Sequence, residues 1–118
     1  MITLEHIQKM LLLYEQRKSL TTIKTQDYDV LLEPLNINKT NTPDTEIYKQ
    51  YERNIVLSLL IHKKLDLVYS LRKICEYKYS KFNLNVDNNK LKISYTFDVK
   101  YLTLTLLVDN IHLMEQLV

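Results

Sequence analysis

The feature that most constrains this sequence is the complete absence of glycine from its 118 residues. Alanine and tryptophan are absent as well. Phosphate-binding loops of the Walker, dinucleotide-fold and kinase types need glycines so that the backbone can approach the phosphates, and the nucleophile elbow of hydrolases needs them at a strained turn. The sequence therefore excludes these sites. It predicts a core built from leucine, isoleucine and tyrosine.

Length and composition indicate a single domain that spans residues 1–118. The chain is 46% hydrophobic and 25% charged, as is usual for globular proteins, and a domain of this size buries roughly two-thirds of its unfolded-chain surface. Its formal net charge of +2 is far from the basic excess that marks nucleic acid as the main partner.

Cellular location and origin also leave traces in the composition. The single cysteine, Cys75, cannot form an intramolecular disulfide, so we expect a reducing, cytoplasmic compartment. Apolar stretches are too short to cross a bilayer, and the first residues lack the basic region of a signal peptide, so we expect no membrane. The dominance of residues with AT-rich codons indicates an AT-rich genome, such as that of a virus, a phage, a mobile element or a low-GC bacterium.

The pattern at the N-terminus predicts a helix over residues 4–18. Thr3 suits an N-cap, and Leu4, Ile7 and Leu11 recur at helical spacing. Residues 19–43 show no sustained period, but they are too apolar for a disordered linker, so we expect a connector that packs over the core with a short strand or a turn of helix.

A long central helix is predicted over residues 43–79. The threonine, proline and aspartate at positions 42–44 have the residue types of an N-cap and of the first two helical positions. Such a helix exceeds the usual globular length, so we expect a kink near residues 62–66. Residues 55–61 are almost wholly apolar, which favours burial on several sides or an oligomer interface.

From residue 82 the period of the apolar residues changes from about 3.6 to 2, which predicts strands. Between residues 90 and 100 every odd position is apolar and every even one is polar, and the sequence Asp87-Asn88-Asn89 supplies a turn without glycine. We therefore expect a β-hairpin.

Residues 102–108 fit two periods, a third strand and a helical stripe that continues to Met114. The paired threonines, Thr103 and Thr105, favour the strand, with Asp109 capping a short C-terminal helix. The predicted fold class is α+β: an N-terminal helix, a long central helix, a three-stranded antiparallel meander and a short C-terminal helix. The helices should cover a sheet face lined by Phe82, Leu84, Leu91, Ile93, Tyr95, Phe97, Leu104 and Leu106.

No group of residues forms a recognised catalytic or metal-binding pattern. His62 with Asp66, and Asp109 with His112, would share helix faces, but no further ligands stand at a known spacing, so ordinary helix pairing is favoured. Cys75 is more simply a small buried side chain than a nucleophile. We therefore predict no catalytic residues, no metal, no cofactor and no enzymatic activity.

One segment, residues 72–82, interleaves bases with aromatic residues. Cations for phosphates and rings for base stacking are what a single-stranded nucleic-acid groove needs. The same residues also suit a helix C-terminus at the margin of a core. The candidate nucleic-acid contacts are Arg72, Lys73, Tyr77, Lys78, Tyr79 and Lys81.

The leading functional prediction is a non-catalytic protein-binding or assembly module that forms homo-oligomers. Residues 55–61 present apolar side chains on all sides of the expected helix, and the edge strands of the expected sheet need partners. A viral or mobile-element origin would suit an inhibitor or adaptor that acts on host machinery. The alternative is a small nucleic-acid-binding regulator. The predicted partner interface is Ile55, Val56, Leu59 and Leu60.

Overall fold

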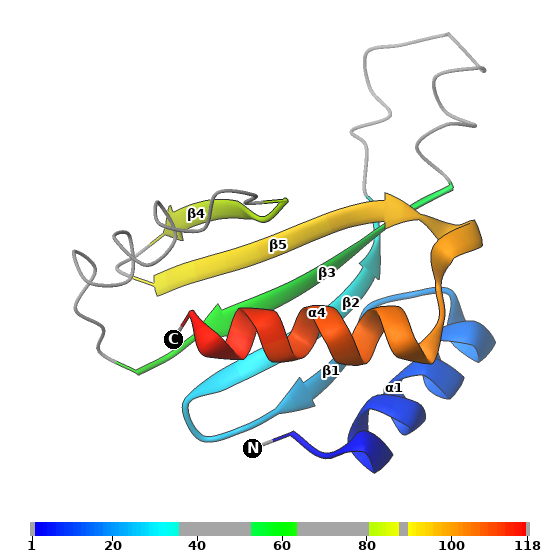
Figure 1. The fold of residues 1–118 in the computed structure, drawn as a ribbon, viewed down its shortest axis with the longest axis horizontal. Helices are drawn as coiled ribbons and strands as arrows, with labels where there is room; N and C mark the ends of the chain where they lie inside the picture. The colour runs from blue at the N-terminus through cyan, green and yellow to red at the C-terminus, as the bar shows by residue number, and fades with distance from the viewer. Residues whose placement is uncertain (1, 36–52, 64–80, 88–89, 118) are drawn as a thin grey trace, which may run out of the picture.

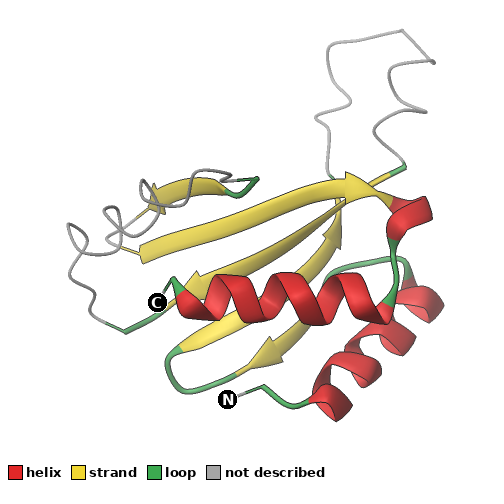
Figure 2. Cartoon of the chain, in the orientation of Figure 1, coloured by secondary structure: helices red, strands yellow, loops and turns green. Residues whose placement is uncertain are grey.

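The computed structural model describes residues 2–35, 53–63, 81–87 and 90–117. In these residues the chain forms two layers, an antiparallel five-stranded sheet and two α-helices on one of its faces (Figures 1 and 2). The fold is therefore α+β, as the sequence predicts, but the predicted long central helix and three-stranded meander are wrong, because the described residues form two α-helices and a five-stranded antiparallel sheet.

The N-terminal helix α1, Leu4–Arg17, confirms the sequence prediction. It begins at a capping box, in which the Thr3 hydroxyl accepts from the His6 backbone N–H and the His6 ring accepts from the Thr3 backbone N–H. It ends because Lys18 adopts the left-handed conformation, with φ of 52°, and its backbone N–H donates to the Tyr14 carbonyl.

Five strands form the sheet: β1 (Thr21–Lys24), β2 (Tyr28–Pro34), β3 (Asn54–Ile61), β4 (Asn83–Asp87) and β5 (Lys90–Asp98). Their spatial order is β1-β2-β3-β5-β4, so β1 and β4 are the two edges (Figure 1). The β4–β5 hairpin is the one predicted from the alternation of apolar and polar residues. The β1–β2 hairpin lies within the segment predicted as a connector with a short strand or a turn of helix.

The predicted long central helix is wrong over residues 54–61, because this segment is the central strand β3. β3 pairs with β2 on one side and with β5 on the other. Side chains on both faces of such a strand are largely buried, so the sequence shows a continuous apolar run without the alternation of a half-exposed strand. The remainder of the predicted helix, including its cap at positions 42–44 and its kink, falls outside the described residues apart from Arg53, His62 and Lys63.

The predicted third strand over residues 102–108 is also wrong. After the short 3-10 helix η1 (Val99–Tyr101), helix α4 runs over Leu104–Gln116. The Thr103 hydroxyl accepts from the Leu106 backbone N–H, so this threonine is the N-cap that the prediction assigned to Asp109. The helical stripe, rather than the pair of threonines, reports the structure, and the sheet has five strands instead of three.

The core lies between the sheet and the two helices. Register places Val30, Leu59 and Ile93 side by side on the face that the helices cover, which we call the inner face. Of the residues predicted to line this face, Phe82, Leu91, Ile93 and Phe97 are buried there, Leu84 and Tyr95 are half-buried, and Leu104 and Leu106 belong to α4 instead. From α1 the core receives Ile7, Met10 and Tyr14, and from α4 it receives Leu107, Ile111 and Met114.

Candidate functional site

The four residues predicted as a partner interface divide between the two faces of β3. Ile55 and Leu59, which are 2% and 0% exposed, are part of the core under the helices. Val56 and Leu60 point to the opposite face, which we call the outer face, and are half-buried. Of the predicted interface, only Val56 and Leu60 present side chains to a surface on which no described helix lies.

An ion pair crosses the outer face. Lys92 Nζ lies 3.7 Å from Glu33 Oε1, although β3 separates their strands. Register puts Glu33 opposite Val56 and Lys92 opposite Leu60, so the pair spans β3 diagonally, and Ser58 lies under the crossing. Ser58 is fully buried, and its hydroxyl oxygen lies 3.1 Å from that of Ser94, with which it shares a hydrogen bond. The outer face is thus covered in part by charged side chains of the sheet itself.

The predicted nucleic-acid segment is described only at its end. Arg72, Lys73, Tyr77, Lys78 and Tyr79 lie outside the described residues. Lys81 is exposed, and its ammonium lies 4.9 Å from the centre of the Tyr95 ring and 5.7 Å from that of Phe82. The Tyr95 ring also stacks on Phe97, with centroids 5.4 Å apart. The described cation of this segment is therefore held against aromatic rings of its own chain.

The described residues among those considered for catalysis or metal binding do not gather into one cluster. Asp66 and Cys75 lie outside the described residues, and His62 Nε2 instead pairs with Asp29 Oδ1 at 3.0 Å. Asp109 and His112 are exposed on α4. Within the described ranges no three histidine, cysteine or acidic side chains are close enough to hold a metal ion. Neither described helix is long and apolar enough to cross a membrane.

A buried polar contact ties the β1–β2 hairpin to α4. The Tyr28 hydroxyl donates to Glu115 Oε2, and Glu115 Oε1 is buried without a hydrogen-bond partner. Burial raises the pKa of the Tyr28 phenol well above its usual value, and the hydrogen bond to Glu115 raises it further. The neutral phenol is thus the form that the folded protein favours.

A hollow in the described structure lies between α1 and β1, and we call it the α1–β1 groove. Its volume is about 280 Å³. Both walls come from short sequence segments, one helical and one extended. The lining residues are His6, Lys9, Met10, Leu13, Thr21, Thr22 and Ile23.

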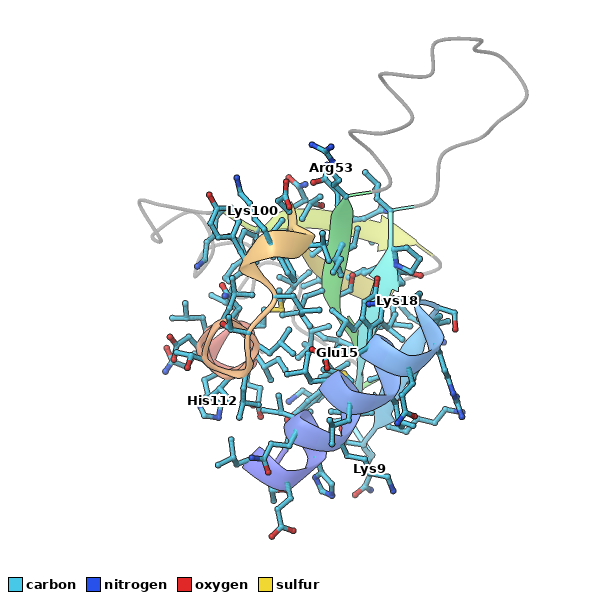
Figure 3. The ribbon with its side chains drawn as sticks, turned by 90° about the vertical axis from the view of Figure 1, so that its right-hand side faces the viewer. Lys9, Glu15, Lys18, Arg53, Lys100 and His112 are labelled. Atoms are coloured by element: carbon cyan, nitrogen blue, oxygen red, sulfur yellow. The ribbon has the colours of Figure 1, made fainter. Side chains whose placement is uncertain are left out.

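Helical geometry explains which side chains of α1 reach the groove. At about 100° per residue, His6, Lys9 and Leu13 fall within about 60° of one another. Met10 lies between this side and the buried side of the helix, so it closes the floor of the groove while being only 1% exposed. Glu15 lies on a different side of α1 from Lys9 (Figure 3).

The other wall of the groove is the free edge of the sheet. The Thr25 backbone N–H donates to the Tyr28 carbonyl, and bonding alternates along an antiparallel pair, so residues 21, 23 and 25 bond to β2. The His62 N–H donates to the Asp27 carbonyl, which fixes the same alternation on the β3 side of β2. The backbone N–H and C=O groups of Thr22 and Lys24 therefore point away from the sheet, and Thr22 lines the groove.

Comparison with protein-family models, with curated proteins and with solved structures finds no match. The site therefore rests on its own geometry. The sequence pattern does not indicate the groove, because residues 21–24, which form β1, fall within the predicted connector. The signal that could have found it is the alternation of Thr21 and Ile23 facing that of Val30 and Leu32, all on the inner face.

Proposed function

We propose that this protein is a non-catalytic protein-interaction module that binds an extended segment of a partner protein along β1. The observation that carries the proposal is the α1–β1 groove, in which the outward backbone groups of the edge strand β1 lie opposite the side of α1 that carries His6, Lys9, Met10 and Leu13. A peptide that adds a strand to a sheet gains affinity from main-chain hydrogen bonds and specificity from alternate side chains.

The dimensions of the groove suit a short strand. β1 has four residues, so at roughly 3.3 Å per residue it offers an edge of about 13 Å. Alternate side chains of an added strand would point to the inner side, toward Met10 and Leu13, and to the outer side, toward solvent. The inhibitor or adaptor role expected from the composition is one form that such binding could take.

The proposal is tested with variants of Thr22 and peptides selected from a random eight-residue phage-displayed library. Proline at position 22 removes the outward N–H, and an edge strand tolerates proline there, whereas valine keeps the N–H and the strand. Selected peptides should bind the Thr22→Val variant like the wild type and the Thr22→Pro variant about tenfold more weakly. Thermal unfolding checks that both variants fold.

Mapping by NMR decides where the peptides bind. In ¹H–¹⁵N spectra the shifted amides should include Thr22 and Lys24. Equal binding by the two Thr22 variants, or shifts confined to β4 or to the outer face, would contradict the proposal. A single-stranded oligonucleotide added in parallel tests the alternative function, for which binding should weaken steeply with salt.

Self-association stays a separate prediction from the sequence. Of the four residues predicted as the interface, Val56 and Leu60 are the candidates that remain, because Ile55 and Leu59 are buried in the core. Sedimentation velocity over a range of concentrations measures it. A dimer that the Val56→Glu variant dissociates, while Leu12→Glu on the exposed side of α1 does not, would support the prediction; a monomer at all concentrations would contradict it.

A further inference from the structure

We infer that the α1–β1 groove selects extended peptides that carry a carboxylate about two positions from an aliphatic side chain. This inference rests on the proposed function and names the chemical class of its ligand. It follows from three properties of the groove: the charge of the side of α1 that lines it, the donor that His6 presents, and the spacing between its cationic and apolar parts.

The groove side of α1 is cationic. Lys9 lines the groove, and Arg17 projects from nearly the same side of the helix as Leu13. Lys24 stands exposed at the end of β1. Of the acidic side chains nearby, Glu5 precedes Lys9 by one turn and is exposed without lining the groove, and Asp29 is paired with His62. The side chains that line the groove include no acid, so a carboxylate in the ligand would meet no like charge there.

His6 adds a directed donor. Its Nδ1 accepts a hydrogen bond from the Thr3 backbone N–H, at 3.4 Å between the nitrogen atoms, as part of the capping box of α1. A neutral ring that accepts at Nδ1 carries its proton on Nε2. The cap therefore fixes the tautomer in which the groove-lining ring can donate to a ligand oxygen through Nε2.

The apolar part of the groove comes from Met10, Leu13 and Ile23. Lys9 and Leu13 are four residues apart, which is about 6 Å along a helix axis. An extended peptide covers the same distance in about two residues. A ligand whose aliphatic side chain packs on Leu13 would thus place a carboxylate near Lys9 and His6 when the acid lies two positions away, on the same side of the added strand.

The experiment uses three synthetic probes with one host sequence. Each is an eight-residue peptide of alternating threonine and valine with one leucine and, two positions from it, glutamate, glutamine or lysine. Affinity is measured by ¹H–¹⁵N NMR titration at low and high salt. We expect the glutamate peptide to bind about fivefold more tightly than the glutamine peptide at low salt, and the difference to shrink at high salt.

Charge reversal provides the second readout. In the Lys9→Glu variant the order should invert, so that the lysine peptide binds best. The control is Lys100→Glu, which makes the same charge change at an exposed position at the other end of the molecule (Figure 3) and should keep the order of the wild type. An inverted order cannot come from a general loss of folding.

The outcomes separate this inference from the proposed function. Equal binding of the three peptides, with shifts at Thr22 and Lys24, would overturn the carboxylate preference and leave strand addition standing. Absence of binding by all three probes, together with failure of the library selection, would overturn both. The inference would also be overturned if the glutamate peptide still bound more tightly than the lysine peptide to the Lys9→Glu variant.

Discussion

The two edges of the sheet differ in what lies beside them. β1 has four residues and runs alongside α1, with the groove between them. β4 has five residues, and neither described helix lies along it (Figure 1). Because hydrogen bonds alternate along an antiparallel pair, the backbone N–H and C=O groups of Leu84 and Val86 point away from the sheet on β4, as those of Thr22 and Lys24 do on β1.

The difference teaches that an unpaired edge is not by itself a binding site. Both edges turn backbone groups away from the sheet, but among the described residues only those beside β1 form a second wall that can contact the side chains of an added strand. Asn83 and Asn85 are exposed on β4, and polar side chains of this kind make an edge a poor template for pairing. The helix beside β1 is therefore the reason why we propose this edge, and not β4, as the binding site.

The largest difference between the edges should appear in stability. Met10 joins α1 to the core beside β1 and is almost fully buried, whereas Val86 on β4 is 49% exposed. We expect Met10→Ala to lower the free energy of unfolding by about 2–5 kcal/mol, because it leaves a cavity, and Val86→Ala to lower it by less than about 0.5 kcal/mol. Urea denaturation measures both. Similar losses would show that the two edges are held equally.

A smaller effect is expected at the far end of the β1–β2 hairpin. Tyr28→Phe removes the donor to Glu115 Oε2, while Oε1 of the same carboxylate already has no hydrogen-bond partner. The expected loss of unfolding free energy at pH 7 is about 1–3 kcal/mol. Tyr101→Phe changes an exposed ring and is the matched control. A loss as small as that of the control would mean that the contact does not hold the hairpin.

The same contact predicts how stability changes at alkaline pH. The pKa of Tyr28 is higher in the folded protein than its ordinary value of 10.0, so the unfolded chain loses the phenol proton first. Stability from this group is therefore complete below about pH 10 and falls as the pH rises above it. Burial raises the pKa of Tyr14 as well, so Tyr28→Phe should make the fall shallower without abolishing it. Chemical denaturation at several pH values between 8 and 11 measures the slope.

Amide hydrogen exchange compares the edges without mutation. In the free protein the outward amides of Thr22 and Lys24, and those of Leu84 and Val86, should all exchange quickly. Addition of a selected peptide should slow exchange at Thr22 and Lys24 by about tenfold, which corresponds to about 1.4 kcal/mol, and should leave the two β4 amides unchanged. If the peptide slowed exchange at Leu84 and Val86 instead, the peptide would bind along β4 and not along β1.

The smallest effect is expected beside β4. The Lys81 ammonium lies over the Tyr95 ring, and such contacts at exposed sites contribute about 0.5–1 kcal/mol. Lys81→Ala should lower the free energy of unfolding by this amount, and Lys81→Arg should retain it. If Lys81→Glu also weakens oligonucleotide binding, the segment of residues 72–82 contacts nucleic acid as the alternative function requires.

The sequence predicts an element of this fold well where one side of the element is buried and the other is exposed, because its apolar residues then recur with a clear period. α1 and β5 each have a buried side and a more exposed side, so the spacing of their apolar residues correctly predicts a helix and a strand. β3 is covered by helices on one face and by the Glu33–Lys92 ion pair on the other, and its apolar run carries no period. Helix α4 begins directly after Thr103, whose hydroxyl caps it. In the sequence, Thr103 and Thr105 alternate with apolar residues as they would in a strand, so the pattern does not reveal the cap.

The groove was harder to predict than either of its walls. The β1–β2 hairpin turns at Gln26 and Asp27, which are not the Asn-Gly or Asp-Gly pair that marks a two-residue turn in a sequence. Without β1, the side of α1 that carries His6 and Lys9 looks like an ordinary exposed surface with one leucine. The groove forms because the short connection at residues 18–20 turns the chain after α1, so that the edge strand β1 lies beside the helix.

The position of β5 has a consequence for synthesis of the chain. β5 lies between β3 and β4, although both precede it in the sequence. On the ribosome β3 can pair with β2 as it emerges, but its other side waits until residue 98 has been made, and α4 follows later still. Apolar side chains such as Leu57 and Leu59 therefore stay partly uncovered while the chain from β3 to α4 is being made. We expect the nascent chain, more than the finished protein, to be the form that chaperones bind.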